Sequence, residues 1–188
     1  MLTKIINYMK TIFTLLLVCI SMQSFAQDKY YTKSGTIIFE SSVPAFEEVK
    51  ATNTKVTAIL KSDGTFAALA LTKAFRFKIA LMEEHFNENY MESTKFPKAK
   101  FAGKIIDFSI NDLSETSKEY RIKGELTLRG ITKNITVKST LKKINKVLHL
   151  TTDFEVTPED FGIEIPSIVR NKIAKKVDVS ISFELRKR

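Results

Sequence analysis

Few side chains of this chain could carry acid–base or metal chemistry. It has two histidines, His85 and His149, and a single cysteine, Cys19. One Cys and two His cannot complete a four-ligand zinc site. His85 has no second histidine close in sequence and no serine or cysteine nucleophile pattern beside it, so we interpret it as a structural residue rather than a general base. His149 belongs to the polar set of an alternating segment, which indicates a solvated position.

Four acidic residues lie close together and could suggest a pair of catalytic carboxylates or a cation site: Asp153, Glu155, Glu159 and Asp160. The first two fall on the polar side of an alternating segment, and Asp160 lies near a predicted helix start, where a carboxylate is favourable. Surface charge and helix capping therefore explain this group. The tripeptide that begins at Asp160 matches a protein-kinase motif by chance, because no Gly-rich loop and no His-Arg-Asp loop accompanies it. We predict no catalytic residue, no metal site, no cofactor and no enzymatic activity.

The elements that must position any site are strands. Apolar and polar side chains alternate with a period of two over residues 120–128, 135–142, 148–156 and 177–185. This pattern is typical of antiparallel strands with one dry and one wet face. Less regular strands are expected at roughly 30–39, 55–61, 65–77 and 98–108, with hairpin turns at 62–64 and 145–146. The total is about eight strands.

One helix is expected between the strands at 65–77 and 98–108. Ile79, Met82, Phe86 and Tyr90 recur at helical spacing, and the helix has ended before Pro97. A second short helical start is expected at residues 157–160, with the threonine as cap and the proline in the first turn. Eight such strands form either a closed barrel, filled or holding one small ligand, or a two-sheet sandwich, and periodicity alone leaves both open.

The first 26 residues differ from the rest. Lys4 and Lys10 precede an apolar run over 12–20, and small residues flank Phe25 at the positions that a signal peptidase reads. We expect a signal peptide over 1–26 that is cleaved after Ala26, which leaves residues 27–188 as one domain in the periplasm or outside the cell. A retained membrane anchor and a lipid attached at Cys19 are the less favoured alternatives.

Length and charge limit the function classes. The 188 residues, 44% of them hydrophobic, suit one ordinary domain with a core. A net charge of +9 could attract nucleic acid or an anionic membrane. Acids are interspersed among the lysines, and the aromatic residues mostly alternate inward instead of forming stacking platforms, so we expect no nucleic acid partner. Weak contact with an anionic membrane surface is the better interpretation.

Four motifs resemble those of a known family: residues 85–91, 95–101, 124–133 and 160–163. In this order and over this span, the chain resembles the YceI-like family of exported bacterial proteins. The resemblance implies an all-β fold with a short helix, namely an antiparallel lipocalin-like β-barrel of about eight strands with one helix packed on it. It also implies a long interior for an isoprenoid or fatty amide chain. Residues 34–41 and 45–49 depart from the His-Ser-rich strand and Gly-x-Phe hairpin that members commonly carry.

We therefore expect an exported protein that sequesters or carries one amphiphilic lipid, an isoprenoid or a fatty amide or acid, inside the barrel. The predicted ligand-binding side chains are those on the inward side of the regular strands: Phe101, Ile105, Ile122, Leu126, Val137, Leu141, Phe154, Val179, Ile181 and Phe183. The alternatives are a structural or stress-related envelope protein with a filled barrel and, less favoured, a hydrolytic enzyme. The identity of the ligand and the oligomeric state, a homodimer included, stay open.

Overall fold

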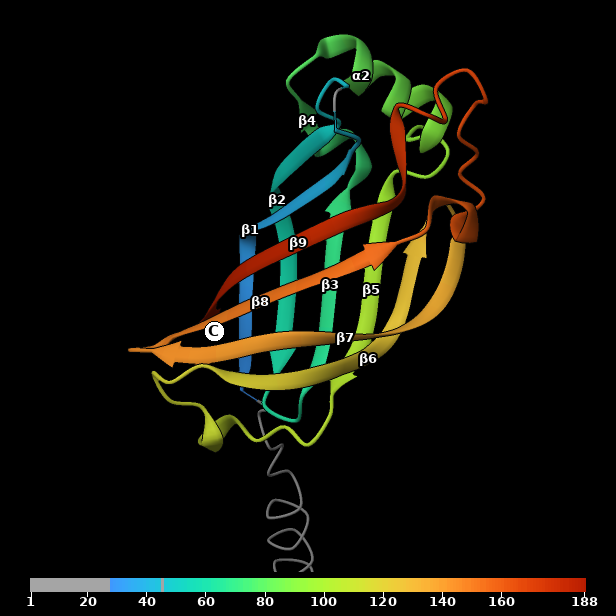
Figure 1. The fold of residues 1–188 in the computed structure, drawn as a ribbon. Helices are drawn as coiled ribbons and strands as arrows, with labels where there is room; N and C mark the ends of the chain where they lie inside the picture. The colour runs from blue at the N-terminus through green and yellow to red at the C-terminus, as the bar shows by residue number, and fades with distance from the viewer. Residues whose placement is uncertain (1–27, 45) are drawn as a thin grey trace, which may run out of the picture.

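The structure is a computed structural model, which describes residues 28–44 and 46–188. Within this part the chain forms nine strands, shown in Figure 1. Their bounds are β1 Lys29–Ser42, β2 Lys50–Lys61, β3 Thr65–Leu71, β4 Arg76–Phe77, β5 Lys98–Ile105, β6 Lys118–Leu128, β7 Ile131–Ile144, β8 Val147–Val156 and β9 Ile173–Lys187.

Eight of these strands close into an antiparallel barrel. The order in the sheet is β1-β9-β8-β7-β6-β5-β3-β2, and β1 also pairs with β2, which joins the two ends. The short β4 pairs only with the beginning of β2, where Ala51 lies opposite Phe77. Closure leaves no open edge along the eight strands. The predicted barrel is confirmed. A two-sheet sandwich is excluded, because all eight strands are hydrogen-bonded to two neighbours in one closed sheet.

The alternation in the second half of the sequence sets which side chains face inward. On β6, Tyr120, Ile122 and Leu126 are buried, while Arg121 and Lys123 between them are exposed. The same parity holds in β8, where Leu148 and Leu150 are buried. Because successive strand side chains point to opposite faces, the apolar set faces the barrel interior and the charged set faces water.

Two early segments differ from the prediction. The strand expected over 65–77 ends at Leu71, because the chain turns there through a short 3-10 helix over Thr72–Ala74. The Thr72 hydroxyl donates a hydrogen bond to the Phe96 carbonyl oxygen at 3.0 Å, and its amide donates to the Pro97 oxygen at 3.0 Å. These bonds tie the turn to the chain before β5. In addition, β2 begins at Lys50, five residues before the strand expected at 55–61.

The predicted helix is present but is interrupted. Helix α2 spans Ala80–His85 and continues as a π-helical turn over Phe86–Tyr90. The second expected helical start is a 3-10 turn over Pro158–Phe161, followed by Gly162 at a positive φ of 64°. Thr157 is the N-cap and Pro158 follows it in the first turn, as expected, although the threonine side chain makes no capping hydrogen bond. No helix in the described ranges is long and apolar enough to cross a membrane.

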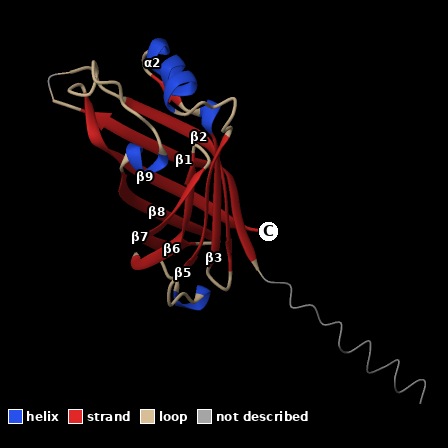
Figure 2. Cartoon of the chain, turned by 90° about the vertical axis from the view of Figure 1, so that its right-hand side faces the viewer, coloured by secondary structure: helices blue, strands red, loops and turns tan. Residues whose placement is uncertain are grey.

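The two ends of the barrel are built differently. Figures 1 and 2 show α2 and the connection between β8 and β9 at one end, and the connection between β5 and β6, with the 3-10 turn Ile110–Asp112, at the other. Tight turns also lie at this second end: Gly64 has φ 84° and Asn145 has φ 55°, as the predicted hairpins require. The side chains near it form a dry core: Leu60, Ile105, Leu141, Leu148 and Leu185 are at most 1% exposed. We call it the closed end.

Candidate functional site: an apolar cavity with one mouth

The barrel encloses a cavity of about 510 Å³ at the end opposite the closed end. Its wall consists of inward side chains of the strands, and these are almost all apolar. Three connections also line it: residues 46–49 between β1 and β2, residues of the helical segment between 82 and 91, and residues between 158 and 172 that join β8 to β9. We call the ring formed by these three connections the mouth.

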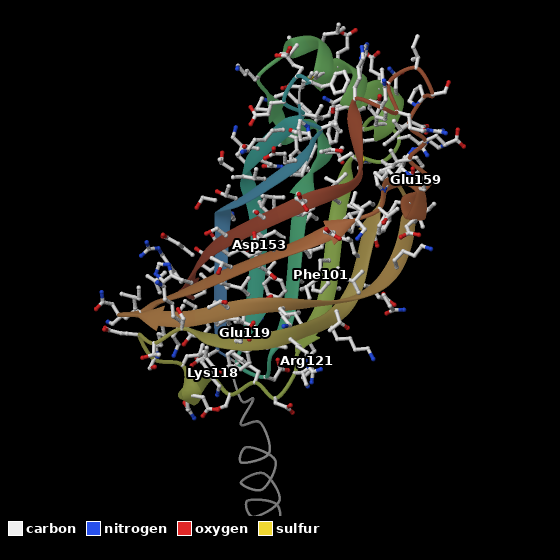
Figure 3. The ribbon with its side chains drawn as sticks, in the orientation of Figure 1. Phe101, Lys118, Glu119, Arg121, Asp153 and Glu159 are labelled. Atoms are coloured by element: carbon white, nitrogen blue, oxygen red, sulfur yellow. The ribbon has the colours of Figure 1, made fainter. Side chains whose placement is uncertain are left out.

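Eight of the ten predicted ligand-binding residues line this cavity: Phe101, Ile122, Leu126, Val137, Phe154, Val179, Ile181 and Phe183. Figure 3 shows Phe101 inside the barrel. The other two, Ile105 and Leu141, point inward but lie in the core of the closed end, 1% and 0% exposed, and are not part of the cavity wall. These two residues are therefore set apart from the eight that line the cavity. The strand alternation predicts the side of the sheet that a residue faces but not its depth along the barrel.

A glycine makes room for the aromatic ring of Phe101. On β5 and β6, Gly103 and Gly124 lie opposite one another. A Cβ atom on Gly124 would lie 2.7 Å from Cζ of Phe101 and 2.4 Å from the carbonyl oxygen of Ala102. Any larger residue at 124 would therefore move either the ring or the neighbouring strand.

A cluster of four phenylalanines just inside the mouth was not predicted from the sequence. Phe39 of β1 lies 5.3 Å from both Phe75 and Phe86, measured between ring centroids, and Phe77 lies 5.2 Å from Phe86. All four line the cavity. They come from β1, from the segment around β4, and from the π-helical turn, and Ala51 of β2 pairs with both Phe39 and Phe77. The cluster fastens the helical segment to the mouth with ring contacts of the size that aromatic pairs prefer.

The hydroxyl groups of Ser41, Thr72 and Thr152 on the wall form hydrogen bonds within the protein. Thr152 lines the cavity, but its hydroxyl donates to the Lys138 carbonyl oxygen and accepts a hydrogen bond from Ser139 Oγ, at 2.8 Å. Tyr90 lies at the mouth, where burial raises the pKa of its phenol above the ordinary value. Most of the wall is apolar, which suits an apolar ligand.

The candidates for chemistry lie apart from one another. His85 is exposed on α2 and borders the mouth, whereas His149 lies on β8 with its Nδ1 4.0 Å from Oε1 of Glu184. Glu155 forms an ion pair with Lys176. Asp153 lies on β8, and Glu159 lies in the turn after it (Figure 3). Among the residues that the structure describes, no group of three or more His, Cys, Asp or Glu side chains is placed to hold a metal.

Arg129 joins three connections at the mouth end of the barrel. It lies in the turn between β6 and β7 and donates hydrogen bonds to the Glu92 carboxylate and to the carbonyl oxygen of Gly162. Glu92 follows the helical segment, and Gly162 follows the 3-10 turn after β8. The ring of Phe96 also lies against Gly130 beside this arginine, where a Cβ would be 2.7 Å from the ring. Three of the four sequence motifs, 95–101, 124–133 and 160–163, therefore meet at this point.

Comparisons with known proteins agree with this geometry. The model of the YceI-like domain matches residues 30–185. None of the curated proteins matches the chain. Among solved structures, a polyisoprenoid-binding domain from Saccharophagus degradans, implicated in plant cell wall breakdown, has a TM-score of 0.76 at 11% identity and covers 85% of this chain and 98% of its own.

Two further solved structures are similar. BcnA of Burkholderia cenocepacia has a TM-score of 0.66 at 12% identity, covering 80% of this chain and 95% of its own. The YceI protein of Campylobacter jejuni has a TM-score of 0.51 at 12% identity, covering 84% and 85%. At these identities the similarity shows a shared fold. The match of the family model over almost the whole described barrel confirms the resemblance in the sequence motifs, and the chain belongs to the YceI-like domain family.

Proposed function

We propose that this protein binds and carries one amphiphilic lipid, with the apolar chain of the lipid inside the barrel. The observation that carries the proposal is the cavity of about 510 Å³, which is walled by apolar side chains, shut at the closed end by a dry core, and bordered at the other end by the mouth. Pockets of this size and polarity are typical small-ligand sites. A polar headgroup would stay at the mouth, where Glu47 and Lys172 provide charged side chains and His85 a polar one.

The cavity volume sets the size of the ligand. If a methylene group takes about the volume of a water molecule in the liquid, roughly 30 Å³, 510 Å³ holds about 17 of them. Burial of each methylene contributes about 0.8 kcal/mol, so even ten buried carbons give about 8 kcal/mol. That gain is comparable with the cost of association, which is about 4–15 kcal/mol. We therefore favour a single chain in the range of a fatty amide, a fatty acid or a short isoprenoid.

The solved relative that binds a polyisoprenoid supports the ligand class, because its fold covers most of this chain. We also propose that the protein is exported, with the signal peptide over residues 1–26, which lie outside the described residues, and acts in the periplasm or outside the cell. We propose no catalytic role. In a structural or stress-related envelope protein the same barrel would hold no lipid, and the following experiment separates the two.

The test is a matched pair of variants on β6. Leu126 is 9% exposed and lines the cavity, whereas Lys123 faces water on the same strand. Leu126→Asp places a carboxylate in an apolar cavity, which is costly unless the group becomes neutral. Lys123→Asp introduces the same carboxylate outside. The delipidated proteins are incubated with geranylgeraniol or palmitamide, and native mass spectrometry counts the bound molecules while circular dichroism confirms folding.

We expect one molecule bound to the wild type and to Lys123→Asp, and none to folded Leu126→Asp. If Leu126→Asp is unfolded, Leu126→Asn gives the same comparison with a neutral side chain. The proposal is wrong if the wild type binds neither probe, or if a folded variant at 126 binds as much as the variant at 123.

A further inference from the structure

Exposed apolar side chains are concentrated at one end of the barrel. Among the described residues, six large apolar side chains are exposed: Phe46, Ile59, Leu71, Leu81, Ile131 and Ile168. Five of them lie at the mouth end, either in the mouth itself or where β3 ends and β7 begins. Ile59 lies on β2, two residues before that strand reaches the closed end. Single exposed apolar residues are ordinary, but a one-sided distribution indicates a contact surface.

Each connection of the mouth places an exposed apolar side chain beside the cavity. Ile168 is 83% exposed, and the next residue, Val169, lines the cavity. Leu81 is 56% exposed, and its neighbour Met82 lines the cavity. Phe46 is 45% exposed and itself part of the wall. A partner that covers these three side chains would therefore also cover the entrance.

The second half of the connection between β8 and β9, together with the first residues of β9, is basic as well as apolar. Residues 165–176 contain four cations and no acid. Lys176 pairs with Glu155, while Arg170, Lys172 and Lys175 are exposed and form no ion pair with any described residue. The acids of the mouth are Glu47 and Glu48 in the connection between β1 and β2, and Glu159, Asp160 and Glu164 in the first half of the connection between β8 and β9. Charge therefore favours an anionic partner at residues 165–176, in the second half of this connection and the start of β9.

We propose that the mouth docks on the surface of an anionic phospholipid membrane through residues 165–176. Ile168 enters the interface between headgroups and acyl chains, and Arg170 and Lys175 lie against the phosphates. Exposed apolar residues beside basic residues are the combination that binds such an interface. The choice of a membrane as the partner rests on the proposed function, because a ligand with a long apolar chain is held in membranes and must enter through this mouth.

The test compares matched variants in sedimentation with vesicles of phosphatidylcholine and phosphatidylglycerol in equal amounts. Ile168→Asp is paired with Ile59→Asp, the same change at the closed end. The double variant Arg170→Glu/Lys175→Glu is paired with Lys123→Glu/Lys138→Glu, the same charge change on exposed outer positions of β6 and β7. Any contribution of residues 1–26 is common to all variants and cancels. Thermal unfolding shows that each protein is folded.

We expect Ile168→Asp to lower the vesicle-bound fraction by about tenfold, the value of one buried apolar side chain. The Arg170/Lys175 variant should lower it by about thirtyfold, at about 1 kcal/mol per cation near the surface. Each control variant should reduce binding by less than a third of the factor expected for its mouth counterpart. Vesicles of phosphatidylcholine alone should bind the wild type weakly. Equal effects of mouth and control variants, or wild-type protein that stays unbound with both vesicles, would overturn the proposal.

The same samples separate docking from lipid carrying. Geranylgeraniol is counted in each variant by native mass spectrometry, with the ligand supplied without vesicles. Retained ligand with lost vesicle binding in Ile168→Asp supports docking as a separate step. If the wild type binds vesicles through Ile168 but holds no ligand, the docking proposal stands and the proposal that the protein carries a lipid is wrong. If the wild type holds ligand while Ile168→Asp binds vesicles normally, the docking proposal is wrong and the proposal that the protein carries a lipid stands.

Discussion

Two leucines that both point into the barrel should differ in their contribution to stability. Leu126 borders the cavity, while Leu141 lies in the core of the closed end with 0% exposure. Replacement of either by alanine removes three carbon atoms, a transfer loss of about 2.4 kcal/mol at 0.8 kcal/mol each. In a fully packed site the new void raises the cost to about 3–5 kcal/mol. At Leu126 one side already faces open space, so fewer contacts are lost and we expect about 1.5–2.5 kcal/mol.

The assay is urea unfolding of delipidated wild type, Leu126→Ala and Leu141→Ala, with the free energy of unfolding extrapolated to water. Equal slopes in the three transitions show that the compared states expose similar surface. Added palmitamide should stabilise the wild type and Leu141→Ala by mass action, and stabilise Leu126→Ala less. If Leu126→Ala costs as much as Leu141→Ala without ligand, the barrel is packed at residue 126 and the cavity does not exist there.

Three other substitutions test the parts that shape the cavity. Arg129→Ala should lower the free energy of unfolding by about 1.5–3 kcal/mol, because two hydrogen bonds to a charged group are lost, and Arg129→Lys should not restore it; chemical denaturation measures both. Gly124→Ala should cost about 1–3 kcal/mol, because its Cβ would lie 2.4 Å from a backbone oxygen of β5; a wild-type melting temperature would contradict that close approach. Phe86→Ala should speed amide hydrogen exchange in α2 more than in β7, since the ring cluster holds the helical segment; uniform or unchanged exchange would argue against that role.

The sequence predicts the second half of the barrel well. From β6 to β9, one side chain in two is apolar, because each strand has one face in water and one inside. This alternation is enough to identify the inward face of β6, and Ile122 and Leu126 indeed line the cavity. It does not identify depth, since Ile105 and Leu141 also point inward but lie at the closed end.

The first half and the mouth are harder to predict for physical reasons. Residues 67–71 are apolar on both sides, so no alternation marks the end of β3 before the turn at Thr72. The phenylalanine cluster joins Phe39 of β1 to Phe75 and Phe86, which follow β2 and β3 in the sequence, so no local pattern indicates it. Arg129 occupies a tight turn, and its partners lie 33 and 37 residues away, so no local pattern indicates its role.

The central claim is that the cavity holds one amphiphilic lipid. Its most direct test is native mass spectrometry of the protein isolated from the envelope of its own cells without detergent, followed by extraction and identification of what is released. We predict a mass excess that corresponds to one single-chain amphiphile per protein chain, with about 15–20 carbons in keeping with the volume of the cavity. Protein that carries no lipid as isolated and takes up neither geranylgeraniol nor palmitamide would contradict the account.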